Sequence, residues 1–77
     1  MNEDLKGMLL LFIGKFVRER GFSPSIRDIM TAIDIDSTSY TRFLLDGLVE
    51  EDLVTYVPTL ARTARLTKKG EKIVFPN

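Results

Sequence analysis

Apolar residues between positions 21 and 53 recur with the period of two short helices. The first run has the i, i+3, i+4, i+7 spacing of one helical face and consists of Ile26, Ile29, Met30 and Ile33. Ser25 precedes this run, and Asp28 stands at the third helical position, which is the arrangement of a capping box. The pattern therefore predicts a helix over residues 26–33.

A second helix is predicted after a short turn in which Ile35 is an apolar plug between two acids. Ser37 or Thr38 is placed to cap it, and it should stop near Glu51. Its buried side is expected to consist of Thr41, Leu44, Leu45 and Leu48. Two short helices joined by a turn of three or four residues are typical of a helix-turn-helix, whose second helix can enter a DNA major groove.

A longer helix is expected over residues 3–20, closed by Gly21 as a left-handed C-cap. At 100° per residue, its core face is predicted to hold Leu5, Met8, Leu9, Phe12, Ile13 and Phe16. The opposite face is predicted to hold Gly7, Leu10, Leu11, Gly14 and Arg18, with Val17 at its edge. Two glycines on one face indicate that something packs closely there. The candidates are the C-terminal segment of the chain and a second subunit.

The last third of the chain predicts a hairpin and a short helix. β-Branched and aromatic residues predict a strand over residues 53–57, with an antiparallel partner over residues 62–66 and a loop that lacks Gly. Thr67 is placed to cap a final helix, from which Ile73, Val74 and Phe75 could cover the first helix. The predicted fold class is mainly α with a small β-hairpin (α+β).

Several motifs resemble the N-terminal DNA-binding domain of the LexA repressor family. They are GFSPSIRDI at residues 21–29, AIDIDSTS at residues 32–39, and the later positions Leu45, Leu48, Leu53 and Val54. The resemblance covers roughly residues 5–66 and implies a winged helix-turn-helix, with a three-helix core and the hairpin as its wing. Residues 66–74 resemble the end of other bacterial winged-helix regulators.

This chain departs from the family at two helix ends. The family usually has Gly after the second and third helices, whereas this sequence has Asp34 and Asp52. Asp tolerates the left-handed conformation better than most residues, so we expect the fold to be retained.

Length and composition restrict the function further. At 77 residues we expect one domain over residues 1–77, with no room after Phe75 for the self-cleaving, dimerising domain of LexA-like proteins. Protease activity is therefore not expected. The carboxylates are scattered, and the sequence has no His, no Cys and no Gly-rich phosphate loop, so we predict no enzyme, cofactor or metal site.

A cytoplasmic location is expected from the same composition. The absence of Cys fits a reducing compartment. The longest apolar run, residues 8–13, is far shorter than the ~20 residues that span a bilayer. No membrane role is predicted.

Charge is distributed unevenly although the formal net charge is zero. Residues 1–27 hold five basic and three acidic side chains, and residues 53–77 hold five basic and one acidic. Residues 28–52, which include the predicted recognition helix, hold one basic and seven acidic side chains. The zero net charge is the main feature that disfavours DNA binding, and the turn and the far end of the predicted recognition helix are acidic.

Residues on the helix-turn-helix and the wing are nevertheless suited to DNA. Arg42 can bond a guanine in bidentate fashion, Phe43 can meet a thymine methyl, and Ser39 and Tyr40 can donate to phosphates or base edges. The predicted DNA-binding residues are Ser25, Arg27, Ser37, Thr38, Ser39, Tyr40, Arg42, Phe43, Arg62, Arg65, Lys68 and Lys69. Asp46 and Glu50 would lie where the helix leaves the groove.

The leading hypothesis is a sequence-specific double-stranded DNA-binding protein, a prokaryotic or phage transcriptional regulator. Its third helix would read the major groove and its wing would hold the backbone. The alternatives are a protein-interaction module that uses Tyr40 and Phe43, and a phage or plasmid replication or partition accessory. A homodimer through the first helix is also expected, on a surface of Gly7, Leu10, Leu11, Gly14 and Val17.

Overall fold

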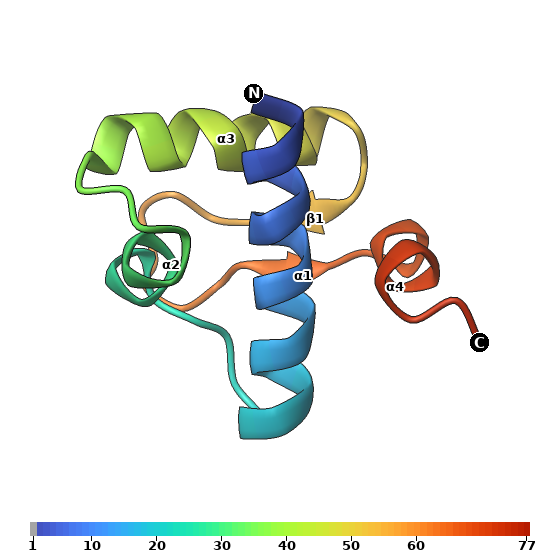
Figure 1. The fold of residues 1–77 in the computed structure, drawn as a ribbon. Coiled ribbons are helices and arrows are strands. Elements are labelled where there is room, and N and C mark those ends of the chain that lie inside the picture. Colours follow the sequence, from blue (N-terminus) through green and yellow to red (C-terminus); the bar gives the residue numbers. More distant parts are fainter. Residues whose placement is uncertain (1) are drawn as a thin grey trace.

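The computed structural model describes residues 2–77 as helices around a two-stranded hairpin (Figure 1). The elements are α1 (Asn2–Arg20), α2 (Ile26–Ile33), α3 (Thr38–Glu50), β1 (Val54–Thr55), β2 (Arg65–Leu66) and α4 (Lys68–Val74). The helix α1 stands between α2 and α4, while α3 lies across its N-terminal half (Figure 1). The predicted class, mainly α with a small hairpin, is confirmed.

Hydroxyl side chains fix the starts of three helices. The Asp28 N–H donates to the Ser25 hydroxyl at 3.0 Å, and the Ser25 N–H donates to the Asp28 carboxylate at 3.0 Å, so both halves of the capping box are present. Ser37 caps α3 by accepting from the Tyr40 N–H at 3.1 Å. Thr67 caps α4 in the same way. Of the two candidates for α3, the cap is Ser37.

Left-handed residues end the first three helices. Gly21 has a φ of 81°, Asp34 of 59° and Asp52 of 62°. The Asp34 N–H donates back to carbonyls of α2, as expected of a C-cap. Both aspartates thus adopt the left-handed conformation, and the fold is retained as expected.

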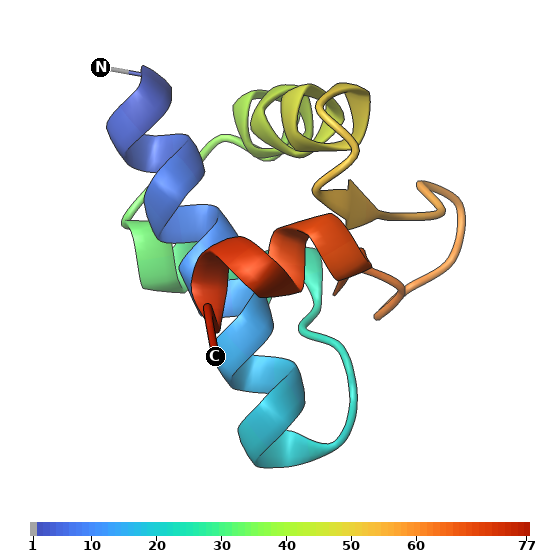
Figure 2. The same ribbon diagram turned by 90° about the vertical axis from the view of Figure 1, so that its right-hand side faces the viewer.

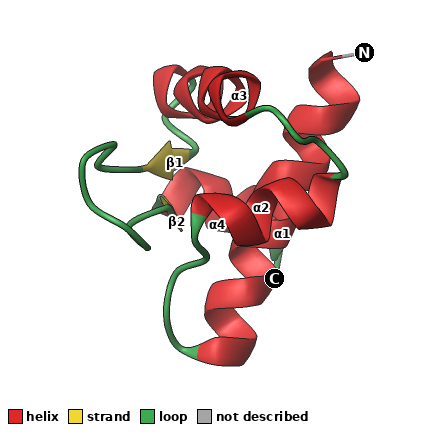
Figure 3. Ribbon diagram, turned by 90° about the vertical axis from the view of Figure 1, so that its left-hand side faces the viewer, coloured by secondary structure: helices red, strands yellow, loops and turns green. Residues whose placement is uncertain are grey.

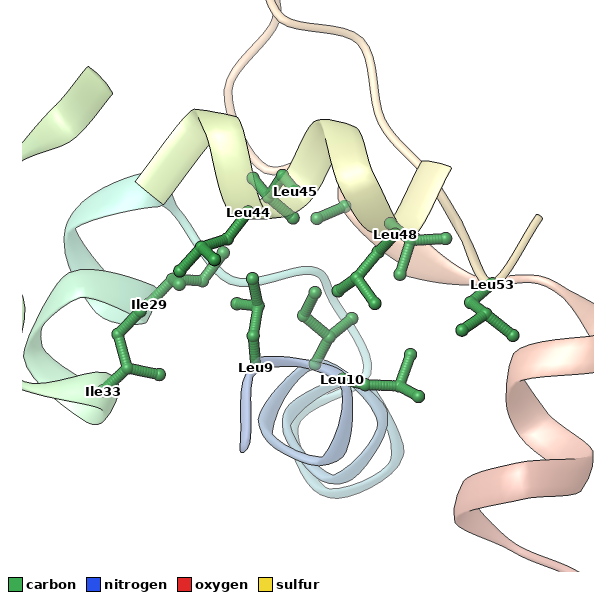
Figure 4. Packing of buried hydrophobic residues seen from close by; sticks show 11 residues of the cluster. Leu9, Leu10, Ile29, Ile33, Leu44, Leu45, Leu48 and Leu53 are labelled. Carbon is green, nitrogen blue, oxygen red and sulfur yellow. The ribbon is translucent and has the colours of Figure 1, made fainter. Parts of the chain in front are cut away.

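The core lies where α1, α2 and α3 meet. Leu9 of α1 points toward α3, with Ile29 of α2 beside it, whereas Leu10 points toward the side of Leu53 (Figure 4). The four residues predicted for the inner side of α3 are all buried. Burial of each leucine among them stabilises the fold by about 1.5–3 kcal/mol relative to exposure.

The predicted register of α1 is wrong at two positions. Met8, expected in the core, is 50% exposed, and Leu10, expected outside, is only 6% exposed. Leu10 belongs to the same cluster as Leu53, Val54 and Ala64, because the hairpin packs on a side of α1 that the periodicity alone assigns to solvent. The buried arc of α1 is therefore rotated toward the hairpin.

The hairpin strands are shorter than predicted. Val54 pairs with Leu66 and Thr55 with Arg65, and the ladder goes no further. Beyond it, the Thr63 hydroxyl accepts from the Val57 N–H at 3.0 Å and donates to the Val57 carbonyl at 3.1 Å. A side chain thus takes the bonds that a longer ladder would have used.

The C-terminal segment covers Gly14. A Cβ built at Gly14 would lie 2.8 Å from Leu66, 3.1 Å from Val74 and 3.4 Å from Phe75. Val74 and Phe75 therefore cover α1 as predicted, whereas Ile73 does not, since it is 57% exposed. Leu10 and Gly14 are buried within the chain, so these two residues of the surface predicted for a homodimer are not available to a second copy, whereas Gly7 and Leu11 are exposed.

Candidate nucleic-acid interface

The outer face of α3 carries the residues that were predicted to meet DNA. Ser39, Arg42 and Phe43 are exposed, and Phe43 is 61% exposed. Its ring stacks on that of the half-buried Tyr40, with 6.1 Å between centroids and 18° between planes. Arg42 makes no hydrogen bond or ion pair within residues 2–77, so its guanidinium is available to a ligand.

A cleft of about 380 Å³ joins this face to the start of α2 and to the wing loop, which we define as residues 56–64. Ser25, Arg27, Arg42 and Arg62 all line it. Figure 3 looks onto this arrangement from the side of α2, with α3 above and the hairpin beside it. Four predicted site residues from three separate segments of the sequence are thus brought together.

Arg62 has a structural function in this cleft. Its guanidinium lies 3.2 Å from the Asp28 carboxylate and donates to the Ser23 carbonyl at 3.2 Å. It also lies 5.3 Å from the centre of the Phe22 ring. Arg62 has a φ of 57°, so it also makes the left-handed turn of a loop that lacks Gly. Arg62 therefore ties the wing loop to the start of α2.

Asp28 is the acid at the centre of this tie. The hydrogen bond from the Ser25 backbone N–H is the main cause that lowers the pKa of Asp28. Burial opposes the shift, while the Ser25 side chain and the positive Arg62 add to it. The carboxylate is consequently ionised over the whole neutral range.

The remaining predicted cations lie elsewhere. Arg65 and Lys68 line a separate groove of about 690 Å³ between α1 and α4, together with Arg18 and Lys72. No residue lines both this groove and the cleft beside α2. Lys69 donates to the Glu51 carbonyl at 3.0 Å, at the end of α3. The predicted basic residues thus form two surfaces instead of one.

A comparison with protein families identifies the family of the fold. The model of the LexA DNA binding domain matches residues 6–63, which include most of α1, all of α2 and α3, and most of the wing loop. The chain belongs to the LexA DNA-binding domain family. The α2–α3 pair is the helix-turn-helix of this LexA domain, and β1 and β2 form its wing.

Relatives of this LexA domain are full repressors. It is 31% identical to the LexA repressor of Clostridium kluyveri over 71 residues, which are 92% of this chain and 35% of the relative. It is 34% identical to that of Lactobacillus johnsonii, over 92% of this chain and 33% of the relative. The chain spans about a third of the length of the curated relatives it matches. No solved structure matched it.

Acidic side chains of this LexA domain lie at both ends of α3. Asp34 and Asp36 share a groove with Arg27 and Arg42 between α2 and α3. At the other end of α3, Glu51 forms an ion pair with Lys6 of α1.

Within the described residues, no helix is long and apolar enough to span a membrane.

Two residues that line these surfaces were not predicted from the sequence. Tyr56 lines the cleft beside α2, and its hydroxyl is buried without a hydrogen-bond partner among the described residues. Arg18 lies over the Phe75 ring, 3.6 Å from its centre, in the other groove. Neither position has a local sequence signal, because each surface is formed by elements that are distant along the chain.

Proposed function

We propose that this chain regulates transcription by binding double-stranded DNA in a sequence-specific way, with α3 in the major groove. The observation that carries the proposal is the cleft that gathers Ser25, Arg27 and Arg42 beside the outer face of α3. In a helix-turn-helix, residues at the start of the recognition helix reach base edges while the neighbouring helix meets the backbone. Membership of the LexA DNA-binding domain family supports a regulator over an enzyme.

Base readout is assigned to the N-terminal half of α3. Arg42 would bond a guanine through both acceptors, and Phe43 would contact a thymine methyl. Ser39 and Tyr40 would donate to base edges or nearby phosphates. Asp46 and Glu50, which are also exposed, lie further along the helix, where the groove curves away.

Backbone contacts are assigned to the start of α2 and to the wing loop. The first N–H groups of α2 carry the positive end of its dipole, and Arg27 is exposed in its first turn. Arg62 would act indirectly, by holding the loop in place. Ser37 also caps α3, which leaves its hydroxyl proton free to donate, and Thr38 is exposed beside it.

The decisive experiment selects binding sites from random DNA with the purified chain at low salt, and then repeats the selection with Arg42→Ala. Losing a bidentate guanine contact should cost about 1–3 kcal/mol and relax one position of the motif. The matched control is Arg65→Ala, which removes the same charge from the other groove and should leave the motif intact.

Arg27→Ala provides the corresponding test of the proposed contacts to the DNA backbone. It should weaken binding to all sequences alike and make the slope of log K against log salt shallower by ~0.9. If Arg42→Ala changes neither affinity nor motif, the major-groove assignment of α3 is wrong.

A protein partner for α3 is the second candidate. The stacked Phe43 and Tyr40 rings lie on a helix whose next outward residues, Asp46 and Glu50, are acidic, which suits a basic or aromatic partner. In this case the DNA selection would return no motif. Phe43→Ala would lose the partner protein while its melting temperature stayed near that of the wild type, because the side chain is exposed.

A further inference from the structure

The outer face of α1 carries four exposed residues in a line, which we call the α1 stripe: Asp4, Met8, Leu11 and Lys15. Leu11 is 44% exposed and Met8 is 50% exposed, so two large apolar side chains lie one turn apart at the surface. The intervals between the four residues are four, three and four, which is the spacing of a coiled-coil seam. The stripe therefore places two apolar side chains, with a charged one at each end, along one side of α1.

The surroundings of the stripe are also apolar. Met8, Leu11 and Lys15 line a groove of about 380 Å³ whose other walls include Phe12 of α1 and Ala32 of α2. Beside the stripe, Gly7 has nothing within 4 Å of where a side chain would begin. Another backbone could approach α1 closely on that flank.

The stripe is complementary to itself when reversed. In two antiparallel helices related by a twofold axis, the numbers of two residues that face each other always add up to the same total. An axis between positions 9 and 10 sets Met8 against the partner's Leu11 and Asp4 against the partner's Lys15. Both apolar pairs and both opposite-charge pairs then form at once, whereas a parallel arrangement would set Asp4 against the partner's Asp4.

We propose that α1 pairs antiparallel with the α1 of a second copy of this chain, through the α1 stripe. The interface is isologous, as expected of a twofold dimer. It differs from the surface of Leu10 and Gly14, which the chain itself covers. With only a few side chains from each copy, the dimer belongs among the small, weak interfaces.

This pairing leaves the proposed DNA site open. The helix α1 and the wing loop lie on opposite sides of the molecule (Figure 2). Two copies joined through α1 would thus each present a cleft and a recognition helix. The pairing does not depend on the proposed function, because self-association is measured without DNA.

A charge-swap experiment tests the pairing in the register proposed. Sedimentation equilibrium at low salt, from roughly 1 to 500 μM, would compare the wild type with Asp4→Lys, Lys15→Glu and the double variant. Each single variant turns both opposite-charge pairs into like-charge pairs and should weaken dimerisation about tenfold, which is about 1.4 kcal/mol. The double variant restores both pairs and should restore dimerisation.

Controls separate this register from a general effect of charge. Lys72→Glu makes the same change on α4 and should leave the dimer unaffected, while Leu11→Glu should abolish it. Circular dichroism would verify that each variant is folded, which is expected because all these side chains are exposed. A wild type that stays monomeric at 500 μM overturns the proposal. So does a double variant that is no better than the single ones.

Discussion

Gly70 of α4 packs directly on the backbone of Leu53, the residue before β1, so it has no space for a side chain. A Cβ added there would lie 3.2 Å from the carbonyl carbon of Leu53 and closer still to its oxygen. That oxygen already accepts the Thr67 N–H at 3.0 Å. Because the clash is with backbone, no side-chain rotation can relieve it. Either α4 or the Leu53 peptide must move by about 1 Å to reach an ordinary contact.

The cost of Gly70→Ala can be estimated from these contacts. Overpacking of this kind costs about 1–3 kcal/mol, and weakening the Thr67 hydrogen bond adds about 1 kcal/mol. Alanine recovers about 1 kcal/mol through its better helix propensity. The net destabilisation is about 2 kcal/mol. In a domain of this size it should lower the melting temperature by about 8–16 °C.

Gly7→Ala is the matched control, since Gly7 lies in α1 with nothing within 4 Å. The same substitution there should gain about 0.5–1 kcal/mol, so the melting temperature should rise by about 2–8 °C. Thermal unfolding followed by circular dichroism at low micromolar concentration measures both. If both variants melt above the wild type, the position of α4 on Leu53 is wrong.

Two further predictions concern the helix caps. Ser37→Ala should cost about 1 kcal/mol of unfolding free energy in denaturant titrations, while Thr38→Ala should cost less, since Ser37 alone caps α3. Equal losses would contradict that cap. The lowered pKa of Asp28 means that its stabilising contribution is complete above the ordinary value of 3.8 and is lost as the pH falls through the folded value. The stability difference between wild type and Asp28→Asn should therefore be largest near neutral pH and shrink in acid, and a constant difference would refute the linkage.

The helix-turn-helix could be predicted from the sequence because local rules determine it. The periodicity, the capping serines and the two left-handed aspartates depend on residues within a few positions of each other. The four buried residues of α3 and the left-handed Asp34 were found for that reason.

What failed depended on contacts between distant parts of the chain. The predicted burial of Met8 and Leu10 was reversed: Met8 is exposed and Leu10 is buried, because the hairpin packs on α1 from a side that periodicity cannot identify. The contact of Arg62 with Asp28 spans 34 residues, so its structural function was hidden. The roles of the predicted DNA-binding residues stay predictions, although Arg27 and Arg42 do lie together on the cleft.

The bond from Arg62 to Asp28 and Ser23 also affects how binding would be driven. A free loop of this length would have to be ordered by its ligand, at a cost of about 1–2 kcal/mol for each residue fixed. Here the loop is already held against α2 in the unbound chain, so this entropy was lost on folding. A duplex whose groove does not match the preset spacing of loop and recognition helix would itself have to deform. Selectivity would then depend on the flexibility of the DNA as well as on the bases that α3 touches.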